Sequence, residues 1–323
     1  MGRRYQRLFI YFSFIPEYPI KTPTLLGCGA LGSLIAGYCQ RANIPLNAFL
    51  PPSCAGQTCY QGQLKLLSGE TIQLSLAKQT LPAEVILVCL KAYQIAPQIA
   101  ALSKLGLIKK NAQIILLNNG LGIREQVLSI LPDADIVNAN STMGALKTAV
   151  GKVQQTGLGQ CTFGRLAPHT STSTPQILQS LIQSHPHAFS WSQQIALSLY
   201  QKLFINCLIN PITARDQVKN GDLLQAKYYD ELLQLSAEIA SLTRKSPTLA
   251  KYGFNQKSVL DQVLQVAGAT AANYSSMNRD IYFKRKTEIE YITGYLLTMA
   301  QSVGIELPTH QALYHLILQA ETT

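Results

Sequence analysis

The stretch Thr24-Leu25-Leu26-Gly27-Cys28-Gly29-Ala30-Leu31-Gly32 decides the fold of the first half of this chain. It is a short apolar run that ends in a GxGxxG turn, and a helical pattern follows it as far as Asn43. Between a strand and a helix, this spacing is typical of a dinucleotide-binding turn, because the first glycine permits the tight turn, the second admits a pyrophosphate and the third allows close helix packing. A purely structural glycine-rich turn is the alternative. We expect the six residues from Gly27 to Gly32 to bind the cofactor, namely Gly27, Cys28, Gly29, Ala30, Leu31 and Gly32.

The residues after the second expected strand, Leu46 to Leu50, bear on which dinucleotide binds. An NAD-binding domain commonly has an acidic residue there, which binds the ribose hydroxyl. This chain has Leu50-Pro51-Pro52-Ser53 instead. Since an acid would repel a 2′-phosphate, its absence favours NADP. A cation for that phosphate is missing as well, which leaves Ser53, Gln57 or the more distant Lys65 as candidates.

Two further apolar runs place polar residues at one edge of a parallel sheet. Val85 to Leu90 reads as a buried strand that ends at Lys91, and Ile114 to Leu117 ends at Asn118-Asn119-Gly120. Ligands of open α/β sheets lie at the carboxyl ends of the strands. We therefore expect Lys91 and Asn119 near the cofactor, although a capping lysine and an ordinary turn asparagine are the alternatives.

The rest of the chain divides into an α/β part and a helical part. Gln63 to Leu76 suggests a hairpin, and the segments Ile136-Val137, Pro175 to Gln183 and Ala188 to Trp191 complete the first part. Helical patterns then occupy Leu197 to Asn210, Asp222 to Arg244, Asn255 to Asn273 and Glu288 to Val303. This predicts an extension over residues 1–21, a Rossmann-type NADP-binding domain over residues 22–192 and an all-helical substrate domain over residues 193–323, with ligand bound between the two domains.

A polar stripe marks the first of these helices, which we expect to end at Asn210, just before Pro211. Lys202, Asn206 and Asn210 recur every fourth residue and share one face of an otherwise apolar helix. Burying an ammonium and two amides without partners is costly, so this stripe indicates a site lined by polar groups, water or ligand. Asn220-Gly221 forms a turn that brings another amide back. A snorkelling lysine with locally satisfied amides is an equally good reading of this segment alone.

Near the C-terminus, Thr287 to Glu290 reads as a capping box, with Thr287 at the N-cap and Glu290 at the third helical position. Glu288 would then start a helix, where a carboxylate is favoured by the helix dipole. On sequence physics alone we interpret Glu288 as a helix-start acid and the run Lys284-Arg285-Lys286 as a solvated turn. Gly304 should end that helix.

Composition limits the class of protein. The 323 residues are 47% hydrophobic and carry a net charge of +10, but the basic residues are dispersed, so an anionic small molecule suits the charge better than nucleic acid. Seven cysteines without a CxxC motif indicate reduced thiols in a cytoplasmic protein, and five histidines without a cluster give no metal site. The run Leu8 to Phe12 is too short to span a membrane, and Pro16 interrupts the signal-peptide pattern.

Six motifs in order resemble those of the ketopantoate reductase (2-dehydropantoate 2-reductase) family. They are GCGALG at Gly27, VCLKAYQ around Lys91, NNGLG around Asn119, KLFINCLINPITA from Lys202, NYSSMNRDI around Ser276 and KTEIEYITGYLL around Glu288. Several of them are not general features of dinucleotide-binding folds, and the similarity runs from about Leu25 to Leu316. The resemblance implies NADPH-dependent reduction of ketopantoate to (R)-pantoate, on the route to pantothenate and coenzyme A, by a monomer or homodimer.

The resemblance also implies roles for individual residues. Lys202 matches the catalytic lysine, the general acid, and Glu288 matches the essential acid, which overturns its interpretation as a helix-start residue. Lys91 and Asn119 match positions near the nicotinamide and the substrate. Glu288 is expected to hold Lys202 or a substrate hydroxyl in register. Substrate-binding positions are matched by Asn119, Asn206, Asn210, Asn220, Asn273 and Ser276.

The chain departs from the family pattern at three places. The second strand lacks the basic residue often found there, Asn278-Arg279 replaces more typical residues before Asp280, and His310 stands where the family more often has an amide. The N-terminal extension has no counterpart. The alternatives are a reductase of another 2-oxo acid and a non-catalytic NADPH-binding paralogue.

Overall fold

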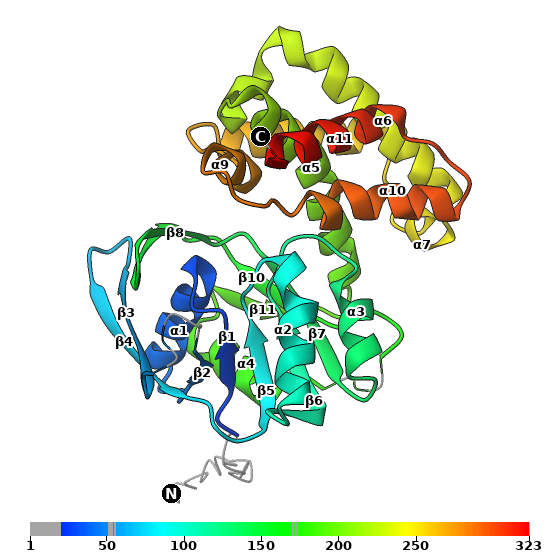
Figure 1. The fold of residues 1–323 in the computed structure, drawn as a ribbon. Coiled ribbons are helices and arrows are strands. Elements are labelled where there is room, and N and C mark those ends of the chain that lie inside the picture. Colours follow the sequence, from blue (N-terminus) through cyan, green and yellow to red (C-terminus); the bar gives the residue numbers. More distant parts are fainter. Residues whose placement is uncertain (1–20, 51–53, 55, 170, 172, 323) are drawn as a thin grey trace, which may run out of the picture.

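The computed structural model describes residues 21–50, 54, 56–169, 171 and 173–322. Of the predicted extension, Met1 to Lys21, only Lys21 is among the described residues, and its ammonium pairs with Glu84. Pro51, Pro52 and Ser53 also lie outside them. The described chain forms an α/β part and a helical part that is stacked on one edge of the sheet (Figure 1).

The α/β part is built on one mixed sheet of eleven strands in the order β11-β10-β7-β6-β5-β1-β2-β4-β3-β9-β8. The five central strands, β2, β1, β5, β6 and β7, are parallel. The strands are β1 (Thr24–Leu26), β2 (Asn47–Phe49), β3 (Cys59–Lys65), β4 (Thr71–Lys78), β5 (Ala83–Val88), β6 (Ile108–Leu116), β7 (Asp135–Ser141), β8 (Gly144–Ala149), β9 (Lys152–Gly157), β10 (Cys161–Gly164) and β11 (Phe189–Trp191).

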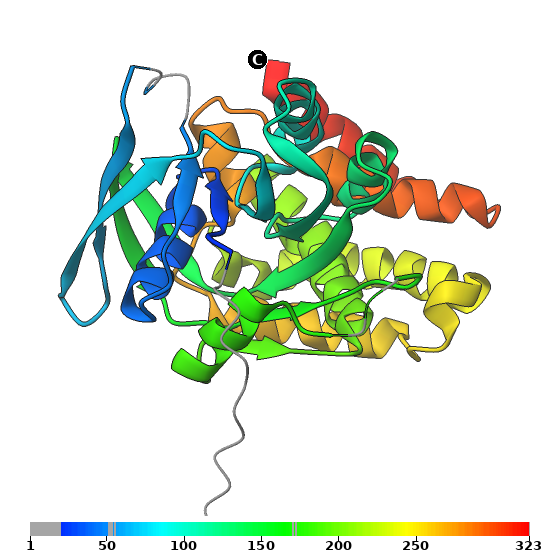
Figure 2. The same ribbon diagram turned by 90° about the horizontal axis from the view of Figure 1, so that it is seen from below.

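Helices cover both faces of this sheet. One core lies under α1 (Ala30–Arg41) and α4 (Gln176–Ser184), and a second lies under α2 (Ala92–Lys104) and α3 (Ile123–Ile130). Figure 2 shows α1 and α4 on one side of the sheet and α2 and α3 on the other. Because both faces are covered, the central strands are continuous apolar runs, as predicted for Val85 to Leu90.

The helical part has one apolar core built around α5 (Ile195–Asp216). The other elements are the 3₁₀ turns η2 (Asn220–Leu224), η3 (Ala226–Tyr228) and η4 (Ile289–Tyr291), and the helices α6 (Tyr229–Lys245), α7 (Pro247–Ala250), α8 (Gln256–Ala269), α9 (Ser276–Tyr282), α10 (Thr293–Ser302) and α11 (Pro308–Thr322). By length and composition α5 could span a membrane, but 61% of its most apolar window is buried inside the protein, so it is a core helix.

The fold class predicted from the sequence, a Rossmann-type domain followed by helices, is confirmed. The expected second strand and the hairpin of β3 and β4 are both present. The expected end of the first long helix was wrong, because α5 continues through Pro211 to Asp216. A proline inside a helix removes one backbone donor, but the surrounding residues Leu208 to Ala214 are buried in the core, which holds the helix together past Pro211.

The capping box expected at Thr287 was also wrong. Glu288 is followed by a short 3₁₀ turn over Ile289–Tyr291, and the α-helix begins only at Thr293. The backbone N–H of Ile289 donates to the Thr287 hydroxyl at 3.1 Å, so Thr287 closes a tight turn instead of capping a helix. The side chain of Glu288 is buried and directed to other partners.

Candidate active site

The glycine turn lies at the carboxyl end of β1, where the order of the parallel strands reverses between β1 and β5. Gly27 has φ +107°, and a Cβ atom there would lie 2.6 Å from the carbonyl oxygen of Cys89. A Cβ on Gly32 would lie 1.9 Å from the carbonyl oxygen of Gly27. Both glycines are therefore required by the protein itself. Ligands of open α/β sheets lie at such a reversal point.

Gly29 differs, because a Cβ atom there would have no protein atom within 4 Å. It stands at the N-cap of α1, where no side chain caps the helix and the first turn contains no acidic residue. Helix N-termini with free N–H groups attract phosphates. The open space at Gly29 and the uncapped amides thus fit the pyrophosphate of a dinucleotide.

Lys202 projects from α5 toward the end of β7. Its Nζ atom donates a hydrogen bond of 2.6 Å to the backbone carbonyl of Ser141, and among the described residues no carboxylate lies within 4 Å of it. Burial lowers the pKa of Lys202 below its ordinary value, and the charge of Glu288 opposes this shift only in part. A lysine in this environment gives up a proton more readily than a surface lysine.

A small pocket lies beside Lys202. Its lining comes from the loop after β6, from β7 and from one face of α5, so it lies at the junction of the two parts of the molecule. The lining residues are Asn118, Asn119, Gly120, Leu121, Ala139, Leu199, Lys202, Leu203 and Asn206. The structure therefore brings together three of the residues expected from the sequence, namely Lys202, Asn119 and Asn206.

Glu288 crosses from the helical part to the α/β part. Its buried carboxylate accepts hydrogen bonds from the backbone N–H of Ala92 at 2.9 Å and from the side-chain amide of Asn119 at 3.4 Å. The ammonium of Lys91 lies 3.4 Å from it. The expected pairing with Lys202 is not formed, because Glu288 points toward the N-terminus of α2 and its carboxylate lies more than 4 Å from Lys202.

Lys91 is held by a second carboxylate, Asp280, whose Oδ2 atom lies 2.6 Å from the ammonium. Burial acts to lower the pKa of Lys91, but the charges of Glu288 and Asp280 outweigh it and raise the pKa above its ordinary value. Lys91 thus remains a cation at the edge of the sheet, whereas Lys202 is the easier proton donor. The two lysines have different electrostatic environments.

Four other residues expected at the substrate site do not line this pocket. Asn210 is buried one turn beyond Asn206 on α5. Asn220 begins η2, donates to the Thr270 hydroxyl at 2.9 Å and keeps a buried Oδ1 atom without a partner among the described residues. Asn273 and Ser276 are exposed near the start of α9.

Sequence reasoning missed two parts of this arrangement. Asp280 is the principal partner of Lys91. In the sequence it is visible only as an acidic residue four positions after Ser276, in a segment to which the apolar pattern assigns no helix or strand. The partner of Lys202 is the backbone carbonyl of Ser141, which no side-chain pattern can indicate. In the described part of the chain, no group of three or more His, Cys, Asp or Glu side chains is placed to hold a metal ion.

Both parts of the chain match models of one protein family. The family model described as ketopantoate reductase PanE/ApbA matches residues 24–168, and the model of its C-terminal region matches residues 194–321. A 2-dehydropantoate 2-reductase of Yersinia pestis is 32% identical over 311 residues, which are 93% of this chain and 95% of that protein.

Solved structures share the fold. A D-mandelate dehydrogenase bound to NADH and anilino(oxo)acetate superposes with a TM-score of 0.81 at 20% identity, over 93% of this chain and 98% of that one. A dimeric ketopantoate reductase from Staphylococcus aureus has a TM-score of 0.75 at 18% identity, over 93% and 99% of the two chains.

Proposed function

The chain belongs to the ketopantoate reductase family, and we propose that it catalyses the NADPH-dependent reduction of ketopantoate to (R)-pantoate, a step of pantothenate and coenzyme A biosynthesis. We further propose a cytoplasmic enzyme that works as a monomer or homodimer. The observation that carries the proposal is Lys202, a partly buried ammonium with a lowered pKa in a pocket shared with Asn119 and Asn206.

The cofactor would be held mainly by backbone. The uncapped N–H groups at the start of α1 and the open approach at Gly29 suit its pyrophosphate, and Cys28, Ala30 and Leu31 complete the turn. Lys91 and Asn119 stand at the neighbouring strand ends. NADPH, when bound, supplies the hydride for the C2 ketone. The choice of NADPH over NADH follows from the lack of an acidic residue after β2.

Lys202 acts on the ketone oxygen. As C2 is reduced, negative charge grows on that oxygen, and a positioned ammonium stabilises it and then transfers its proton to give the alcohol. The Ser141 carbonyl fixes the direction of the ammonium through one of its three N–H donors, which leaves two donors for substrate. The lowered pKa of Lys202 favours the transfer.

Glu288 organises the part of the site around Lys91 and Asn119. By accepting from Ala92 and Asn119 it fixes the loop after β6 against the start of α2, and by pairing with Lys91 it balances that charge. Asn206, one turn after Lys202, is placed to bind substrate oxygens in the same pocket. We retain Asn210, Asn220, Asn273 and Ser276 as residues that contact substrate when the two parts of the molecule close.

The rival function is reduction of another 2-oxo acid on the same framework. NADPH oxidation followed at 340 nm with ketopantoate and with 2-oxoisovalerate, which lacks the 4-hydroxyl, separates the two. A site built to bind that hydroxyl discriminates strongly against an analogue without it. We expect kcat/KM at least about 100-fold higher for ketopantoate. Equal values would favour the rival, and no oxidation with either acid would indicate the non-catalytic paralogue.

A further inference from the structure

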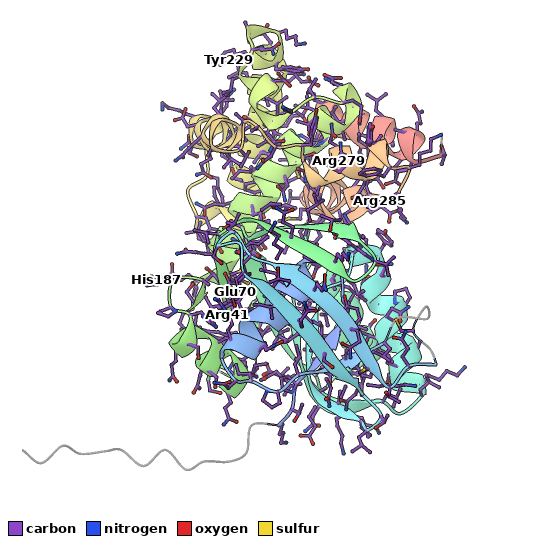
Figure 3. The ribbon with its side chains drawn as sticks, turned by 90° about the vertical axis from the view of Figure 1, so that its left-hand side faces the viewer. Arg41, Glu70, His187, Tyr229, Arg279 and Arg285 are labelled. Carbon is purple, nitrogen blue, oxygen red and sulfur yellow. The ribbon has the colours of Figure 1, made fainter. Side chains whose placement is uncertain are left out.

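Helix α5 carries Lys202, the general acid of the proposed reaction, and it also connects the two parts of the molecule. It follows β11 in the chain, its first turns contact β7 and β10, and it continues into the core of the helical part. Figure 3 shows this helix reaching from the helical part to the sheet. The position of Lys202 relative to the sheet therefore depends on how the start of α5 is fixed to β7.

Two consecutive residues at the end of β7 bind α5. The side-chain amide of Asn140 donates to the carbonyl of Ser198 at 3.1 Å. The carbonyl of Ser141 accepts from Nζ of Lys202 at 2.6 Å. Because Ser198 and Lys202 are four residues apart, they share one face of the helix. The end of the strand is thus joined to α5 at two neighbouring points.

The Ser198 carbonyl is also the helical partner of Lys202. In an α-helix each carbonyl accepts from the N–H four residues later, so the Ser198 carbonyl holds the backbone of Lys202. A carbonyl oxygen has two lone pairs and accepts this bond together with the one from Asn140. The backbone and the ammonium of Lys202 are consequently both fixed through adjacent residues of one strand.

The carbonyl that binds the Lys202 ammonium belongs to a well-supported strand end. Ser141 stands opposite Cys161 in the antiparallel pair of β7 and β10. The Ser141 hydroxyl also accepts from the backbone N–H of Met143 at 3.3 Å. The carbonyl therefore moves relative to Lys202 only when this strand end shifts along α5, and the bond from Asn140 opposes that shift.

The titratable groups around Lys202 come from two elements. Cys161 of β10 and Glu288 both raise the pKa of Lys202, but burial has the larger effect and keeps it below its ordinary value. Burial also raises the pKa of the Cys161 thiol to about 12, so this thiol is neutral near pH 7. The Ser141 carbonyl stabilises the charged form of Lys202, and loosening that bond lowers the pKa of the lysine further.

We propose that Asn140 is a positioning residue for the proposed reduction: it fixes the end of β7 against α5 and thereby keeps the Lys202 ammonium on the Ser141 carbonyl, beside the pocket. This inference rests on the proposed function, because Lys202 is the proton donor of that reaction. Asn140 is not among the residues that line the pocket, so it acts on the substrate only through Lys202.

The test is Asn140→Ala, which removes the donor to Ser198. We expect kcat with NADPH and ketopantoate to fall about tenfold, because a small misplacement of a catalytic group has effects of this order. The high-pH limb of the kcat profile, where Lys202 loses its proton, should move down by roughly half a unit to one unit. The KM for ketopantoate and the Kd for NADPH should stay within about twofold, since Asn140 lies outside the pocket lining.

Asn138→Ala is the matched control. Asn138 lies two residues earlier on the same face of β7 and is also buried, but within the described chain it makes no hydrogen bond to α5. It should leave kcat and the high-pH limb unchanged. Asn140→Leu keeps nearly the same side-chain volume, so it separates the loss of the hydrogen bond from the effect of a cavity. It should reproduce both changes of Asn140→Ala.

The pKa of Lys202 is also measurable without turnover, from the pH dependence of its labelling by acetic anhydride, followed by mass spectrometry. A lower labelling pKa in both Asn140 variants supports the inference even if ketopantoate is not reduced, in which case only the proposed substrate fails. The inference is overturned if the labelling pKa does not fall in these variants, if Asn138→Ala lowers it equally, or if an active enzyme keeps its full kcat in them. Failure of both Asn140 variants to fold would show a purely structural role and would overturn it as well.

Discussion

Glu288 pairs with Lys91, and not with Lys202: its carboxylate lies 3.4 Å from the Lys91 ammonium, although the two residues are 197 positions apart. The same carboxylate accepts from Ala92 and Asn119. One buried side chain thus joins the helical part to the ends of β5 and β6. This leaves Lys202 free to act on substrate.

Glu288→Gln should weaken this junction. The amide can still accept from Ala92, but it no longer balances the charge of Lys91, which keeps only Asp280. We expect the free energy of unfolding to fall by about 1–3 kcal/mol and kcat/KM for ketopantoate to fall by about tenfold or more. Urea denaturation and the NADPH assay measure the two effects. Glu290→Gln, at an exposed neighbouring position, is the control, and equal effects in both variants would contradict this role.

Two glycines of the dinucleotide turn should respond differently to alanine. Gly32→Ala places a Cβ 1.9 Å from the Gly27 carbonyl, so we expect a loss of stability of about 1–3 kcal/mol or more. Gly29→Ala meets no protein atom and should melt like the unchanged protein.

The Gly29→Ala variant also tests cofactor binding. If Gly29 faces the pyrophosphate, Gly29→Ala should lose the rise in Tm that NADPH produces in the unchanged protein, because its Cβ occupies the space of the ligand. Thermal scans with and without NADPH provide the measurement. A normal NADPH-dependent rise in Gly29→Ala would place the cofactor elsewhere.

Sequence reasoning succeeded where a pattern is local. The GxGxxG turn and the apolar run before Lys91 specify their strands through periodicity and glycine stereochemistry alone, and both lie where predicted. Two members of the expected stripe, Lys202 and Asn206, line one pocket because residues four apart share one helix face, whereas the third, Asn210, is buried outside that lining.

It failed where tertiary contacts outweigh local rules. Pro211 should end a helix, but burial of α5 in the core of the helical part keeps the helix intact to Asp216. The last helix, α11, was not predicted: it begins at Pro308, because proline suits the first position of a helix. The capping box expected around Glu288 does not form, because the Glu288 carboxylate is bound by buried partners in the α/β part of the molecule. The strands β8 and β9 were not predicted, since most of their residues are polar or exposed as in a loop, and the buried β10 is only four residues long.

The pair of His310 and Glu238 should make stability depend on pH. Nδ1 of His310 lies 2.7 Å from Glu238, and Glu238 also accepts from the backbone N–H groups of Thr309 and His310. Burial lowers the pKa of His310, while burial of Glu238 is outweighed by these hydrogen bonds, which lower its pKa to about 2. The folded protein therefore binds fewer protons here than the unfolded chain.

The sign of the pH effect follows from the imidazole. Its contribution is fully present above the ordinary histidine pKa and is lost as pH falls below it, because only the unfolded chain then takes up the proton. Between pH 7 and pH 5 we expect the unchanged protein to lose about 1–2 kcal/mol of unfolding free energy that His310→Gln does not lose. Urea denaturation at both values tests this, with His187→Gln at an exposed position as the control. The same pH-dependent loss in His310→Gln would contradict the assignment.

The most direct test of the account is the kcat of Lys202→Ala with NADPH and ketopantoate at saturating concentrations, measured together with its Kd for NADPH. As a general acid, Lys202 should be worth about 10²–10⁴-fold in kcat, while the Kd should change little because the dinucleotide turn is untouched. A kcat within a few-fold of the unchanged protein would contradict the role of Lys202 and, with it, the proposed mechanism.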